Sequence, residues 1–210
     1  MKVTIIALLA LLLYGCSPTN SSDGYGWNSN NPVSDSLCKR LEWQFNDYCP
    51  LESINHTLEM LNRASDTPSA QHLCRLVYWK ARYLSRIGQQ DAALRLVDNA
   101  LNEFEIPPSS QEYLRMRAFL VVHKDTIKGD EEYRVYKECM DYSREMGDHA
   151  SEAMMAVYLG NLFRSIGEYQ QSMEHYRLAD SLSESLGFKK FVVKNKLNEA
   201  LVLKAMGNKA

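Results

Sequence analysis

The chain has 210 residues and a formal net charge of −2, with 45% apolar and 24% charged residues. This length suits one domain of ordinary size, and the balance of residues excludes a globally disordered chain. Glycine and proline are too rare for a collagen-like or low-complexity protein. Because the charge shows no basic surplus, the composition does not indicate a nucleic-acid-binding protein.

The N-terminal residues 1–16, MKVTIIALLALLLYGC, combine one positive charge with a short apolar run. Lys2 precedes the run from Val3 to Leu13, which as a helix is about 16 Å long. Because a membrane-spanning helix needs about 20 residues, this run is typical of a cleaved export signal. A buried N-terminal helix is the alternative, and the absence of a polar face disfavours it.

The apolar run ends in Leu13-Tyr14-Gly15-Cys16. This motif resembles the lipobox of bacterial lipoproteins, in which an aliphatic residue and two small residues precede a cysteine. Tyr14 departs from the pattern, whereas the other three residues match it. The resemblance implies that residues 1–15 are a removed signal peptide and that Cys16 is lipidated. Several acyl chains anchor a protein firmly, so we expect a lipid-anchored protein of the bacterial cell envelope, at the periplasmic face or outer membrane.

The segment 17–34, SPTNSSDGYGWNSNNPVS, is rich in Ser, Asn, Gly and Pro and has no apolar period. Such a composition predicts a flexible tether. We therefore expect three parts: the signal peptide 1–15, the lipidated cysteine with its tether over 16–34, and a folded domain over 35–210.

The folded domain shows a repeat of about 40 residues. Gly88, Gly129, Gly167 and Gly207 are 41, 38 and 40 residues apart, and Cys49-Pro50 stands 39 residues before the first of them. No strand-like alternation or hairpin dipeptide interrupts this period. It predicts stacked helical hairpins, in each of which a left-handed residue ends the first helix. The predicted helices span 35–47, 51–64, 69–87, 90–104, 109–127, 130–146, 149–166, 168–186 and 189–206.

The fourth hairpin carries the most specific spacing. Its small and aromatic positions are Ala156, Leu159, Gly160, Phe163, Gly167, Tyr169, Tyr176 and Ala179. This spacing resembles the tetratricopeptide repeat, except that Ser172 stands where alanine is usual. The resemblance, shared less closely by the other hairpins, implies an all-α protein: a right-handed α-solenoid of about four and a half tetratricopeptide-like hairpins. Exported tetratricopeptide lipoproteins of Bacteroidetes are similar.

No catalytic or metal-binding motif is recognisable. The five histidines are scattered, and no phosphate-binding glycine loop, GxSxG or dinucleotide fingerprint occurs. We therefore expect no enzymatic activity, no cofactor and no metal site. Export permits disulfides, and Cys38–Cys74 is the bridge that we expect if one forms. The simpler alternative is that Cys38, Cys49, Cys74 and Cys139 are all buried as thiols.

Tetratricopeptide arrays line a concave groove with the first helix of each hairpin. Applied to this chain, the resemblance predicts a groove of cations and aromatics that suits an acidic peptide. The alternative is that these are ordinary solvated residues. The predicted groove residues are Trp43, Arg75, Tyr78, Arg82, Arg86, Phe119, His123, Asn161 and Arg164, and the groove-facing set also includes Lys39, Lys194 and Lys204.

The predicted function is that of a lipid-anchored protein–protein interaction scaffold, which binds a peptide or protein segment and no nucleic acid. The alternative is the sensor portion of a Bacteroidetes transcriptional regulator or histidine kinase without its output domain. The helix predicted over 189–206 has four consecutive apolar residues, Ala200 to Leu203. We expect this helix either to be an imperfect cap of the solenoid or to meet another segment, which would be a second copy of the chain or the rest of a longer, truncated chain.

Overall fold

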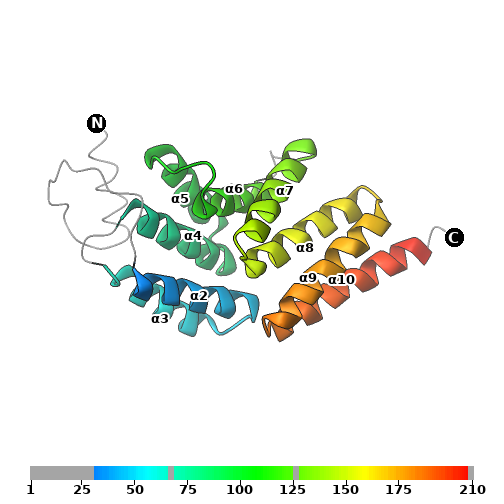
Figure 1. Ribbon diagram of the computed structural model, residues 1–210, viewed down its shortest axis with the longest axis horizontal. Helices are drawn as coiled ribbons and strands as arrows, with labels where there is room; N and C mark the ends of the chain where they lie inside the picture. Colours follow the sequence, from blue (N-terminus) through cyan, green and yellow to red (C-terminus); the bar gives the residue numbers. More distant parts are fainter. Residues whose placement is uncertain (1–30, 66–68, 125–127, 208–210) are drawn as a thin grey trace. The chain divides into compact units, whose positions relative to one another are not determined.

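The computed structural model describes residues 31–65, 69–124 and 128–207, and these residues are all-α, with nine helices and no strand (Figure 1). The all-α prediction is confirmed. Every predicted helix is present, and its ends lie within three residues of the predicted ones except at the end of α6. The helices are α2 Pro32–Asn46, α3 Leu51–Asn62, α4 Ala70–Arg86, α5 Gln90–Glu103, α6 Gln111–His123, α7 Asp130–Glu145, α8 His149–Ser165, α9 Tyr169–Ser185 and α10 Lys189–Gly207.

The N-terminal predictions fall mostly outside the described residues. The signal peptide, Cys16 and the tether as far as residue 30 are not described. The tether nevertheless ends earlier than expected, because α2 begins at Pro32 and Ser34 is already buried. Proline suits the first turn of a helix. The side chain of Asn31 caps this turn by accepting a hydrogen bond of 3.0 Å from the backbone N–H of Ser34.

The helix ends follow the predicted turn chemistry in part. Gly88 and Gly167 have φ values of 83° and 85° and follow α4 and α8 directly, as predicted. Gly129 is instead the N-cap of α7, and Gly207 is the final residue of α10. After α2, the left-handed position belongs to Tyr48, with a φ of 53°, and not to Cys49-Pro50.

The helices form two compact units. Unit 1 comprises α2 as far as Leu41 together with residues 51–106, and α4 packs there against both α3 and α5. Trp79 is the largest fully buried side chain of this unit. Unit 2 comprises residues 42–50 and the chain from Pro107 onward, in which α6 to α10 pack consecutively, each against the next.

The core of unit 2 is built where α8 and α9 approach closely. Ala156, Gly160 and Ala179 are buried there, and the ring of Tyr176 packs onto the backbone of Gly160. A Cβ atom on Gly160 would lie 2.6 Å from Cε1 of Tyr176. The Ser172 hydroxyl donates a hydrogen bond of 2.7 Å to the Gly160 carbonyl. Serine in place of the usual alanine is therefore accommodated without an unpaired hydroxyl.

We expect Gly160→Ala to lower the free energy of unfolding. Overpacking costs roughly 1–3 kcal/mol, which exceeds the gain of about 1 kcal/mol from alanine over glycine in a helix. Urea unfolding followed by circular dichroism measures this difference. Gly207→Ala is the matched control, because a Cβ at this helical position meets no atom within 4 Å. An unchanged midpoint for Gly160→Ala would mean that α8 and α9 lie further apart than described.

Candidate functional site

The residues predicted to line the groove are divided between the two units. Arg75, Tyr78, Arg82 and Arg86 lie on α4 in unit 1. The other residues of the predicted set lie on α2, α6, α8 and α10. Lys39 is in unit 1, and the rest are in unit 2: Trp43, Phe119, His123, Asn161, Arg164, Lys194 and Lys204. The predicted residues therefore fall into two sets, one in each unit.

The set on α4 contains an aromatic pair that is covered by a cation. Tyr78 is only 4% exposed, so its predicted position on an open groove surface is wrong. Its ring packs edge-on against Trp79, with the centroids 5.0 Å apart. The Arg82 guanidinium lies over both rings, 5.3 Å from the Trp79 centroid and 5.8 Å from that of Tyr78. Arg82 is thus held by cation–π contacts and is not simply a solvated charge.

The other end of α4 is partly neutralised by an acid. Arg75 Nη1 forms an ion pair of 2.5 Å with Asp35 on α2. The predicted groove set contains no acid, but Arg75 nevertheless has an acidic neighbour from another helix. One turn earlier, His72 is buried and its Nδ1 lies 3.1 Å from the Ser34 hydroxyl. Burial, assisted by the charge of Arg75, lowers the pKa of His72.

The predicted residues on α6 and α8 are mainly structural. Phe119 is 6% exposed, against the prediction, and its ring packs 4.5 Å from that of His123. Asn161 accepts a hydrogen bond of 2.7 Å from the Tyr176 hydroxyl. Arg164 is half-buried at the end of α8. These side chains were expected on a groove surface because helical spacing places a residue on a face, and spacing alone does not say which face is covered.

Trp43 is the predicted aromatic residue that faces solvent, with 46% of its surface exposed. It lies one turn before Asp47, which accepts a hydrogen bond of 3.3 Å from the backbone N–H of Lys190 at the start of α10. The next residue, Tyr48, is also exposed, and Lys194 Nζ lies 5.2 Å from the centroid of its ring. We call Trp43, Tyr48, Lys190 and Lys194 the Trp43 surface.

The backbone of Tyr48 is in a conformation that side chains disfavour. Its φ of 53° is the only positive value at a non-glycine residue in the described ranges. The turn is a helix C-cap, in which the backbone N–H of Cys49 bonds to the Gln44 carbonyl at 2.9 Å. Tyr48 and Lys190 were not among the residues predicted from the sequence. The repeat period itself points to Tyr48, because it stands 40 residues before Gly88.

A half-buried ion cluster fixes the segment that carries Trp43. Arg115 on α6 donates hydrogen bonds of 2.7 Å to Glu42 and to Asp148, and one of 2.9 Å to the Ser151 hydroxyl. Burial alone would raise the pKa of Asp148, but Arg115 and the hydrogen bonds from Ser151 outweigh it and hold this pKa below its usual value. The end of α2 is thereby joined to α6 and α8 within unit 2.

The four cysteines of the described residues are free and differ in burial. All four cysteines are thiols, so the expected Cys38–Cys74 bridge is not formed. Cys74 and Cys139 are buried, whereas Cys38 and Cys49 are only half-buried, which corrects the alternative of complete burial. Burial raises the pKa of the Cys139 thiol to about 12, so this thiol is not a nucleophile at neutral pH.

No group of three or more His, Cys, Asp or Glu side chains in the ranges 31–65, 69–124 and 128–207 is placed to hold a metal ion. No described helix combines the length and the hydrophobicity that a membrane crossing requires.

Comparison with known proteins gives no family. The chain matches no protein-family model, no curated protein and no solved structure. Function must therefore be inferred from the surfaces of the molecule itself.

We expect Tyr48→Gly to stabilise the fold by about 1 kcal/mol. A left-handed non-glycine residue costs roughly 1–3 kcal/mol, and part of this gain is offset by the extra freedom of glycine in the unfolded chain. Thermal and urea unfolding measure the change. Tyr48→Ala is the control, because it removes the ring and retains the Cβ atom. If Tyr48→Gly were no more stable than Tyr48→Ala, the backbone at residue 48 would not be strained.

Proposed function

We propose that this protein is a lipid-anchored, tetratricopeptide-like scaffold of the bacterial cell envelope that binds a segment of another protein through the Trp43 surface. The hairpin order of the helices supports a repeat architecture, as does the close packing of Ala156, Gly160 and Ala179 between α8 and α9. The partner segment is acidic, because it must face Lys190 and Lys194.

The observation that carries this proposal is the exposed pair Trp43 and Tyr48 beside two lysines. Tryptophan and tyrosine are enriched among the residues that dominate binding energy at interfaces. Lysines beside them attract carboxylates. Tyr48 occupies the left-handed position after a helix, which is glycine in four other turns of the described chain. Strain of this kind persists at positions where a side chain has a function.

Trp43→Ala tests the surface. We expect it to weaken partner binding at least tenfold, since truncation of a central aromatic commonly costs about 2 kcal/mol. The partner is first isolated by affinity capture from the native envelope, and its affinity for wild type and Trp43→Ala is then measured by titration. Raising the salt concentration should weaken binding to the wild type, because part of the attraction is ionic.

Met60→Ala is the matched control for this experiment. Met60 on α3 is also a large exposed apolar residue, but it lies in unit 1 and outside the Trp43 surface. Its substitution should leave both the captured proteins and their affinity unchanged. Equal affinity of wild type and Trp43→Ala for every captured protein would show that binding occurs elsewhere.

The lipid anchor has its own test. We expect Cys16→Ser to move the protein from the membrane fraction to the soluble fraction, because serine has no sulfur atom to carry the lipid. Fractionation of cells followed by immunoblotting measures the distribution. Cys38→Ser is the control, because Cys38 belongs to the folded helix α2. Retention of Cys16→Ser at the wild-type level would contradict the anchor.

A further inference from the structure

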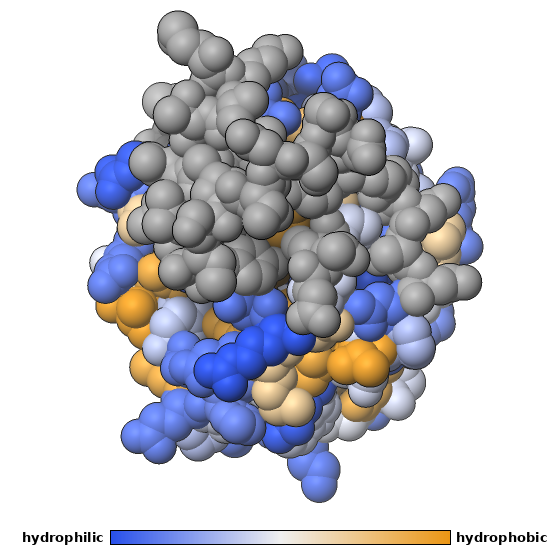
Figure 2. Space-filling view, turned by 90° about the vertical axis from the view of Figure 1, so that its left-hand side faces the viewer, coloured by the Kyte–Doolittle hydropathy of each residue, from blue (hydrophilic) through white to orange (hydrophobic). Residues whose placement is uncertain are grey.

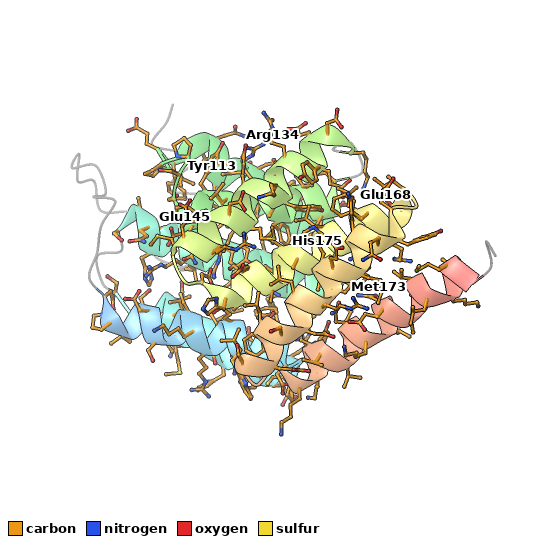
Figure 3. The ribbon with its side chains drawn as sticks, turned by 45° about the vertical axis from the view of Figure 1, so that its right-hand side comes forward. Tyr113, Arg134, Glu145, Glu168, Met173 and His175 are labelled. Carbon is orange, nitrogen blue, oxygen red and sulfur yellow. The ribbon has the colours of Figure 1, made fainter. Side chains whose placement is uncertain are left out.

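The outer face of α10 carries an apolar ridge. Val193, Leu197 and Leu201 are 71%, 62% and 42% exposed. They are spaced at i, i+4 and i+8, so they form one row along the helix. The opposite face of α10 packs on α9, where Asn195 and Val202 are buried and Met173 lies between the two helices (Figure 1, Figure 3). We call Val193, Leu197 and Leu201 the α10 ridge.

This ridge is not the ordinary scatter of exposed apolar residues. Isolated apolar side chains are normal on a protein surface. On the face shown in Figure 2, apolar residues lie in small groups between hydrophilic ones. By contrast, five of the fourteen large apolar residues that are exposed in the described chain belong to α10 alone: the three of the α10 ridge together with Leu203 and Met206.

The charges around the α10 ridge are almost all positive. The helix α10 contains five lysines and one glutamate. Lys190 and Lys204 fall on the same side of the helix as the ridge, at its two ends, and are about 21 Å apart along the axis. The single acid, Glu199, lies close to Lys196, with 3.2 Å between its Oε1 and the lysine Nζ. The ridge is therefore apolar along its length and carries a lysine at each end, with Lys190 Nζ 3.9 Å from Asp47 Oδ2.

We propose that the α10 ridge docks an amphipathic helix of a partner protein, whose leucine-like residues pack on the ridge and whose flanking acids face the lysines. A row at four-residue spacing is the surface that packs into the grooves of another helix. Within unit 2, consecutive helices pack side by side from α6 to α10, so a helix on the ridge continues the existing packing. The basic ends select an acidic partner.

Two other occupants fit less well. A second copy of this chain would bring Lys190 and Lys204 of one ridge against those of the other, and like charges in contact are unfavourable. A membrane surface suits a helix with a wide apolar face, whereas the α10 ridge covers an arc of about 80° at 100° per residue. The docked helix is a separate ligand from the segment at the Trp43 surface, although Lys190 belongs to both surfaces. Substitutions in the ridge leave Trp43 and Tyr48 in place, so each proposal can fail independently.

The test uses the full chain carrying Cys16→Ser, so that acylation does not mask binding. The probe is a fluorescent synthetic helical peptide of about 18 residues, with leucines at i, i+4 and i+8 and glutamates on both flanks. A second peptide has lysines in place of the glutamates. Fluorescence anisotropy measures the dissociation constant of each. We expect the acidic peptide to bind at least tenfold more tightly than the basic one, and more weakly as salt is raised.

Leu197→Ser removes the centre of the ridge, and we expect it to weaken the acidic peptide at least tenfold without changing the unfolding temperature, because Leu197 is largely exposed. Met60→Ser is the matched control and should bind as the wild type does. The proposal is overturned if both peptides bind equally, or if neither binds. It is also overturned if the wild type sediments as a dimer and Leu197→Ser as a monomer. The same holds if Leu197→Ser weakens binding to phosphatidylglycerol vesicles but not to the acidic peptide.

Discussion

A single guanidinium holds three helices of unit 2 together. Arg115 on α6 bonds to Asp148 at the start of α8 and to Glu42 on α2, which is 73 residues away in the sequence. Asp148 also caps α8, since its Oδ1 accepts the backbone N–H of Ser151 at 3.2 Å. Charges that are largely removed from water need partners. Both carboxylates therefore depend on Arg115, and the bond to Glu42 joins the end of α2, which bears Trp43, to α6 within unit 2.

The sequence predicted the helices well because the information for them is local. Apolar periodicity, capping side chains and glycine at helix ends lie within a few residues of the feature that they determine. Gly88 and Gly167 identified two turns correctly for this reason. The close contact of α8 and α9 was also predictable, because Gly160 and Ala179 fall in a spacing that only a helical hairpin uses. Gly129 was misassigned because glycine, although commonest after a helix end, also occurs as an N-cap.

The candidate site was predictable only in part, because burial depends on residues far away in the sequence. Tyr78 and Phe119 have the spacing of exposed groove residues, but tertiary packing covers them. The acids that approach the predicted cations were also hidden. Asp35 reaches Arg75 across 40 residues, and Asp47 reaches Lys190 across 143. Spacing along one helix contains no information about such partners. Trp43 is exposed as predicted, and the left-handed turn at Tyr48 could have been predicted from the 40-residue period.

The polar contact between α9 and α10 determines which face of α10 remains outside. Asp180 on α9 is buried, accepts a hydrogen bond of 2.6 Å from Asn195 and forms an ion pair with Lys196. The Asn195 amide also donates to the Tyr176 carbonyl at 2.8 Å. The hydrogen bond to Asp180 raises the pKa of Lys196, so the lysine stays charged at neutral pH.

Apolar burial is not directional and would favour turning α10 so that its leucines face inward. That rotation would carry Asn195 and Lys196 away from α9 and leave the Asp180 carboxylate buried without its partners. Breaking a buried ion pair typically costs about 3–5 kcal/mol, which opposes the gain from burying the row. The α10 ridge therefore faces outward because the polar atoms of α9 require Asn195, and the exposed apolar row is a consequence of satisfying one buried carboxylate.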